Sequence, residues 1–176
     1  NIRARVELGN YFRTEQQLDS SDHYFRSIIT SRDMIKLRPY YDHLALVELG
    51  YNLYLRGSYD NAADYYRYAA DFARKEGNHT LAATIFTGLG EVYQAKKAPA
   101  EVKAMIDSAF VYLHKGKTGA DNPVYLRLYP LMYKYYAEKG NMPLFQAYLD
   151  SATVVRHRRE ERFNAQVLLR AEQEVA

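Results

Sequence analysis

Residues 49–69 read LGYNLYLRGSYDNAADYYRYA, and their spacing predicts two helices joined by a short turn. Leu46, Leu49 and Leu53 lie at i, i+3 and i+7, which places them on one stripe of an α-helix. Gly57 then ends this helix, and Ser58 can accept a bond from the N–H groups that open the next one. The second helix carries its own stripe, made of Ala62, Tyr66, Ala69 and Ala73. Two helices joined by so short a turn must lie antiparallel.

Small residues occupy the positions at which these two helices would meet. A glycine inside a helix costs roughly 1 kcal/mol relative to alanine, so Gly50 indicates a need for close contact. Together with Ala62 it would let the helix axes approach to roughly 8–10 Å. The alternative is a chance glycine in an ordinary helical hairpin.

These residues resemble the tetratricopeptide repeat. That pattern has a small residue in the first helix, Gly-x-Tyr at the turn, and Ala-x3-aromatic-x2-Ala in the second helix. The matching positions are Gly50, Gly57, Tyr59, Ala62, Tyr66 and Ala69. Leu46 and Leu53 stand where the family prefers Trp and Tyr. The resemblance implies an all-α fold, a short right-handed solenoid of about four antiparallel helix pairs.

Looser copies of the pattern cover the rest of the chain. We place the repeats at residues 1–38, 39–78, 79–119 and 120–155, within a single domain spanning 1–176. Positions 9, 50, 90 and 133 are then equivalent, with intervals of 41, 40 and 43 residues. The family period is about 34, so we expect helices nearer five turns than four. Pro39, Pro99 and Pro123 are each predicted to open a helix. In the first repeat Gln16-Gln17-Leu18 replaces the Gly-x-Tyr turn.

Composition excludes several classes of function. The 24 Lys and Arg residues are mixed with 21 Asp and Glu residues, and the net charge of +3 is too balanced to argue for a nucleic-acid or membrane surface. The chain has no cysteine, which excludes disulfides and thiolate metal sites. No apolar run approaches the roughly 18 residues that span a bilayer. Because the chain starts without Met, in what already reads as helix, we expect it to be a piece of a longer protein.

The sequence gives little support to catalysis. The five histidines are scattered singly, and no two lie at i and i+4 as on a metal-binding helix face. Glu48 and Glu91 take different repeat positions, so a catalytic carboxylate pair is not expected from them. We therefore predict no enzyme activity, no cofactor and no metal ion. A triad assembled from distant segments stays open at this point.

The last segment, residues 150–176, contains no helix breaker. Phe163, Val167 and Ala171 continue an apolar stripe past the fourth repeat. The run from Arg156 to Arg162 holds four arginines with Glu160 and Glu161 among them, which is typical of a solvated helix face. Residues 156–176 are thus either a helix that caps the last repeat or a connector toward a membrane span or a coiled coil. We expect this helix to fray beyond about Arg162.

The resemblance also implies where a partner would bind. In the family the first helix of each repeat lines a groove, and the corresponding residues are Asn10, Arg13, Tyr51, Tyr54, Thr87, Glu91, Gln94 and Lys134. Tyrosines in the middle with polar groups at both sides suit an extended peptide or a partner helix. Tyr51, Thr87 and Glu91 break the two-carboxylate clamp of the chaperone-binding members, so that function is not expected. The alternative is a groove filled by the protein's own flanking segments.

We interpret the chain as a non-catalytic module that recognises a protein or peptide. Long tyrosine-rich repeats that end in an unbroken charged helix look like the sensor half of bacterial membrane-anchored regulators, which implies an extracytoplasmic position. The alternatives are a cytoplasmic scaffold or adaptor and the docking domain of an enzyme. No nucleic acid is expected to bind through this domain. The sequence leaves the oligomeric state open.

Overall fold

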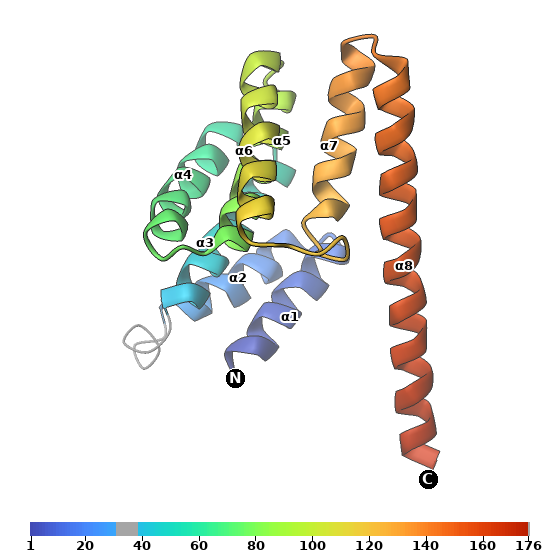
Figure 1. The fold of residues 1–176 in the computed structure, drawn as a ribbon. Helices are drawn as coiled ribbons and strands as arrows, with labels where there is room; N and C mark the ends of the chain where they lie inside the picture. Colours follow the sequence, from blue (N-terminus) through green and yellow to red (C-terminus); the bar gives the residue numbers. More distant parts are fainter. Residues whose placement is uncertain (31–38, 176) are drawn as a thin grey trace. The chain divides into compact units, whose positions relative to one another are not determined.

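The computed structural model describes residues 1–30 and 39–175. Within these ranges the chain forms eight α-helices and no β-strand (Figure 1). In chain order the helices are α1 (Ile2–Thr14), α2 (Leu18–Ile29), α3 (Pro39–Leu55), α4 (Tyr59–Lys75), α5 (His79–Ala95), α6 (Pro99–Lys115), α7 (Tyr125–Glu138) and α8 (Met142–Val175). The prediction of an all-α fold is confirmed.

Helix packing follows chain order inside each of two compact units. In the first unit, residues 1–116, each helix from α1 to α6 packs against the next, and α1 also touches α3 while α3 touches α5. In the second unit, residues 117–176, α7 packs against α8. This adjacent packing is the repeat-like arrangement that the sequence predicts. The single continuous domain over 1–176 stays a prediction.

One residue in each of the four turns within a helix pair has a left-handed backbone. These residues are Gln16 (φ 59°), Gly57 (φ 78°), Lys97 (φ 58°) and Gly140 (φ 68°). Each donates its N–H to the carbonyl three residues earlier, and the next N–H reaches the carbonyl five residues earlier, as when Ser58 donates to Leu53 at 2.9 Å. The four positions recur at the intervals of 41, 40 and 43 residues derived from the sequence.

Helix lengths and boundaries agree with the prediction in the middle of the chain. The helices α3 to α6 each contain 17 residues, about 4.7 turns, whereas α1 and α2 contain 13 and 12. The helices α3 and α6 begin at Pro39 and Pro99, as expected. The prediction that Pro123 starts a helix is wrong by two residues, because Asn122 closes a turn there. Its side chain accepts from the Val124 N–H at 3.0 Å and its carbonyl accepts from the Tyr125 N–H at 3.1 Å.

The second helix of each of the first three pairs buries the stripe predicted for it. The buried residues are Ser21, Phe25 and Ile28 on α2, Ala62, Tyr66, Ala69 and Ala73 on α4, and Val102, Ile106 and Ala109 on α6. In α3 the core is broader than the predicted stripe, because this helix packs against both α2 and α4. There Ala45, Val47 and Leu49 are buried, while Leu46 and Leu53 are half-buried.

The helix α8 is continuous over 34 residues, so residues 156–175 extend the second helix of the fourth pair. Figure 1 shows it continuing well beyond the N-terminal end of α7. Phe163, Val167 and Leu168 on this extension are 65%, 50% and 65% exposed. None of the described helices combines the length and the apolar character needed to cross a membrane.

Candidate functional site

The predicted groove residues of α1 and α3 lie together, with Arg13 at their centre. Its Nε donates to Asn52 Oδ1 at 2.6 Å and its Nη1 donates to Glu48 Oε2 at 2.6 Å. Nη1 also donates to Asn10 Oδ1 at 3.3 Å, and Nη2 donates to the backbone oxygen of Glu48 at 3.1 Å. These bonds use four of the five N–H donors of a guanidinium. Arg13 therefore joins two helices of this chain, and its donors are largely committed before any ligand arrives.

Two tyrosines of α3 continue the surface from Arg13, since Tyr51 contacts Arg13 and Tyr54 stacks on Tyr51. The Arg13 guanidinium carbon lies 4.9 Å from the centre of the Tyr51 ring and 5.2 Å from that of Phe25, within the range of a cation–π contact. Tyr51 stacks on Tyr54 with ring centres 6.0 Å apart and planes 10° from parallel. Both tyrosines are half-buried. We call Asn10, Arg13, Glu48, Tyr51 and Tyr54 the α1/α3 surface.

A polar network centred on the buried Asn52 holds the residues of this surface in place. Asn52 is fully buried, and its Nδ2 donates to Ser21 Oγ at 2.9 Å and to Asp22 Oδ1 at 2.6 Å. The other oxygen of Asp22 accepts from Arg56 Nη1 at 2.8 Å. Through Asn52 the network joins α1, α2 and α3. Because each of these side chains has a hydrogen-bond partner, the network fixes the register of the three helices and holds the Arg13 guanidinium against the Tyr51 ring.

The remaining predicted groove residues have other surroundings. Thr87 on α5 is 1% exposed, and its hydroxyl donates to the carbonyl of Ala83 at 2.9 Å. Glu91 and Gln94, also on α5, are half-buried. The Gln94 Nε2 is buried and has no hydrogen-bond partner among the described residues. Lys134 is exposed on α7, in the second unit. The side chains that the structure brings together are thus those of Asn10, Arg13, Tyr51 and Tyr54.

Sequence patterns did not indicate Glu48, Asn52 and Asp22 as members of the site. One signal could have indicated Asn52, because it lies on the same helical stripe as Ala45 and Leu49, where an apolar residue is expected. A polar residue on a buried stripe implies hydrogen-bond partners on neighbouring helices. The sequence offers Glu48 only as a possible partner of Glu91, whereas the structure pairs it with Arg13.

The geometry of the α1/α3 surface suits recognition more than chemistry. The Glu48 carboxylate is only 18% exposed and is held in an ion pair with Arg13, so it is poorly placed as a general base. Within residues 1–30 and 39–175 no three His, Asp or Glu side chains gather in a way that could hold a metal ion. The expectation of a non-catalytic chain without a cofactor stays a prediction.

The sequence matches no protein-family model, and no curated protein is significantly similar to it.

Proposed function

We propose that this chain is a tetratricopeptide-like repeat module, a short right-handed solenoid that recognises an extended peptide through the α1/α3 surface. Support for the repeat assignment comes from the left-handed residues of the four turns within helix pairs, which recur at intervals of 41, 40 and 43 residues. The contact between the first helices of successive pairs, α1 with α3 and α3 with α5, also fits such an array.

The observation that carries the binding proposal is the stacked, half-buried pair Tyr51 and Tyr54, in which the Tyr51 ring contacts the fixed Arg13. Tyrosines are enriched among the residues that dominate binding energy, because they offer a large rigid surface and a polar end. Rings that are already held by a cation–π contact and by stacking lose little conformational entropy when a ligand packs against their exposed part. Asn10 and Glu48 at the edge supply polar groups that can fix the direction of a peptide backbone.

We further propose that the module is the extracytoplasmic sensor half of a bacterial membrane-anchored regulator, a cytoplasmic scaffold being the alternative. The support is the extension of α8 beyond residue 162, where described apolar side chains such as Phe163 and Leu168 are mostly exposed. Such a helix suits a connector to a following segment. The coding sequence downstream of Ala176 tests this. A run of 18 or more apolar residues soon after it supports the sensor, and continued soluble repeats contradict it.

The experiment that tests the binding proposal is selection of a phage-displayed random peptide library on the immobilised chain. Enriched peptides are then synthesised, and their affinities are measured for the wild type and for the double variant Tyr51→Ala, Tyr54→Ala. We expect the double variant to lose at least about 2 kcal/mol of binding free energy, as for a hot-spot pair, and to keep its helical circular dichroism. The matched control is Tyr68→Ala, which removes a tyrosine that is 66% exposed on α4. Equal binding by the wild type and the double variant would refute the assignment of the surface.

A further inference from the structure

A small cavity lies in the second unit, between the loop that precedes α7 and the middle of α8. Its volume is about 190 Å³, below the roughly 300–1,000 Å³ of pockets that hold drug-sized ligands. Pro123, Leu126 and Val155 supply an apolar part of its lining. The cavity therefore suits a small molecule with one apolar face.

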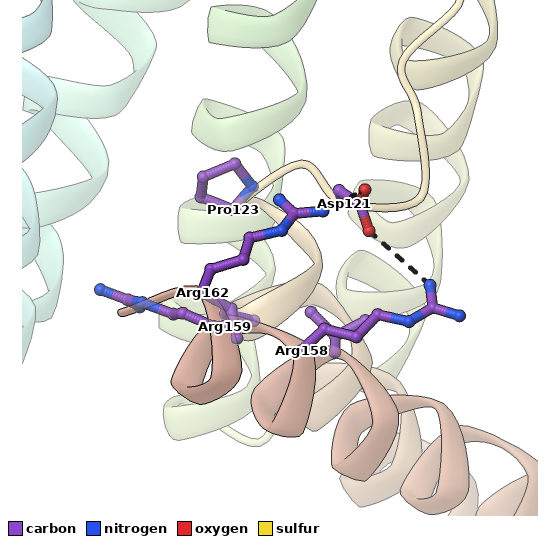
Figure 2. Close-up of a pocket in the computed structure, with 7 residues that line it drawn as sticks. Asp121, Pro123, Arg158, Arg159 and Arg162 are labelled. Carbon is purple, nitrogen blue, oxygen red and sulfur yellow. Dashed lines mark hydrogen bonds and ion pairs between the residues drawn. The ribbon is translucent and has the colours of Figure 1, made fainter. Parts of the chain in front are cut away.

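Charged side chains complete the lining, and two of them converge on one carboxylate. Arg158 and Arg162 lie one helical turn apart on α8, and both reach Asp121 in the loop (Figure 2). Arg158 Nη1 lies 3.7 Å from Asp121 Oδ1, and Arg162 Nη2 donates to Asp121 Oδ2. In this arrangement an oxyanion reaches the Arg162 guanidinium, and the Arg158 guanidinium lies beside it.

The cavity carries more positive charge than Asp121 neutralises. Arg159 also lines it, extends away from Asp121 in Figure 2, and has no ion pair among the described residues. Three guanidinium groups against one carboxylate leave a surplus of two positive charges. The nearby Glu161 does not line the cavity, and its Oε1 lies 3.2 Å from Nε2 of His157.

We propose that this cavity binds a phosphate monoester, with the phosphate on Arg159 and Arg162 and a small apolar group on Pro123, Leu126 and Val155. A phosphate monoester carries a charge of about −1.5 to −2 at pH 7, which matches the surplus. Guanidinium groups recognise phosphate through paired, charge-assisted hydrogen bonds. Asp121 acts as an internal competitor, because its carboxylate occupies Arg158 and Arg162 in the absence of ligand.

The proposal is tested by titrating phenyl phosphate into the full chain at low ionic strength and measuring affinity by calorimetry or by chemical-shift changes. We expect saturable binding that Arg159→Gln weakens by roughly three- to tenfold, an effect limited by the exposure of the site. Asp121→Asn is expected to tighten binding, because it removes the competing charge and frees two arginines. Inorganic phosphate should bind more weakly than phenyl phosphate, since it lacks the group that packs on the apolar lining.

The matched control is Arg156→Gln, which removes the same charge from α8 at a residue that does not line the cavity. An equal loss of affinity in the Arg156 and Arg159 variants would overturn the proposal in favour of general attraction to a basic helix. Weaker binding by the Asp121 variant would contradict the competitor role. Vesicles of phosphatidylcholine with and without phosphatidic acid separate the sources of the phosphate. Arg159-dependent binding to the acidic vesicles alone identifies a lipid headgroup as the ligand. Saturable binding of phenyl phosphate identifies a free phosphate ester. Binding to neither overturns the proposed site.

Discussion

Replacing Gly88 by alanine tests the close packing of α4 against α5. A Cβ at this position would lie 2.4 Å from Cζ and 2.8 Å from the hydroxyl oxygen of Tyr66. The Tyr66 ring is fully buried, so it cannot swing into solvent to make room. At an open helical site the same substitution would stabilise the protein by roughly 1 kcal/mol. Overpacking costs about 1–3 kcal/mol. Because the contact is so short, we expect the upper end of that range and a net loss of about 1–2 kcal/mol.

The matched control is Gly50→Ala, which makes the same chemical change in α3. There the added Cβ would lie 3.3 Å from Tyr65 Cβ and 3.3 Å from Tyr66 Cε1, so the neighbours need to give by only a few tenths of an ångström. The gain in helix propensity then offsets most of the strain. We therefore expect the free energy of unfolding of this variant to lie within about 0.5–1 kcal/mol of the wild-type value. Thermal and urea unfolding followed by far-UV circular dichroism measures both variants.

A double-variant cycle assigns the effect to the Tyr66 ring. Tyr66→Leu removes the atoms that meet the new methyl group, so Gly88→Ala should cost less in that background than in the wild type. If Gly88→Ala is as stable as the wild type, or costs the same with and without Tyr66, the close approach of α4 and α5 is refuted.

Four further substitutions or measurements test other parts of the structure. Ala62→Leu overpacks a fully buried site and should lower the free energy of unfolding by about 1–3 kcal/mol, so a neutral urea midpoint would contradict the repeat alignment. Lys97→Gly should raise the free energy of unfolding by about 0.5 kcal/mol, and with it the thermal midpoint, because glycine adopts the left-handed backbone at φ 58° without the steric penalty of lysine. Asn52→Leu leaves the buried side of the Asp22 carboxylate without its amide partner and should cost about 2–3 kcal/mol, measured by the same denaturation. Amide hydrogen exchange in α8 should be fast beyond Arg162, and uniformly slow exchange to the end of the helix would contradict the fraying prediction.

Patterns that depend on local sequence predicted the helices and their buried faces. The stripe from Ala62 to Ala73 lies in the core because its 3.6-residue period needs only the residues of α4 themselves. Gly57 and Gly140 indicate turns because glycine adopts positive φ without strain. Gln16 and Lys97 adopt the same backbone without that signal, held by the same pair of turn hydrogen bonds. Only the repeat spacing, compared across all four turns, could have predicted them.

Contacts between residues far apart in the sequence were beyond reach of such patterns. Arg13 meets Glu48 and Asn52, which lie 35 and 39 residues later, and the pairing depends on the exact register of α1 against α3. The arginines of α8 read as a solvated face, because Glu160 and Glu161 are interleaved with them. Only the tertiary structure brings the Asp121 carboxylate next to Arg158 and Arg162 of α8.

The most direct measurement of the central claim is hydrogen–deuterium exchange of the chain with and without a peptide selected on it. We expect the peptide to slow exchange in residues 8–14 of α1 and 46–55 of α3, the segments that carry Arg13 and the stacked pair Tyr51 and Tyr54. This protection should disappear in the double variant Tyr51→Ala, Tyr54→Ala. Protection confined to α4, or to the second unit, would show that the α1/α3 surface is not where this protein recognises its partner.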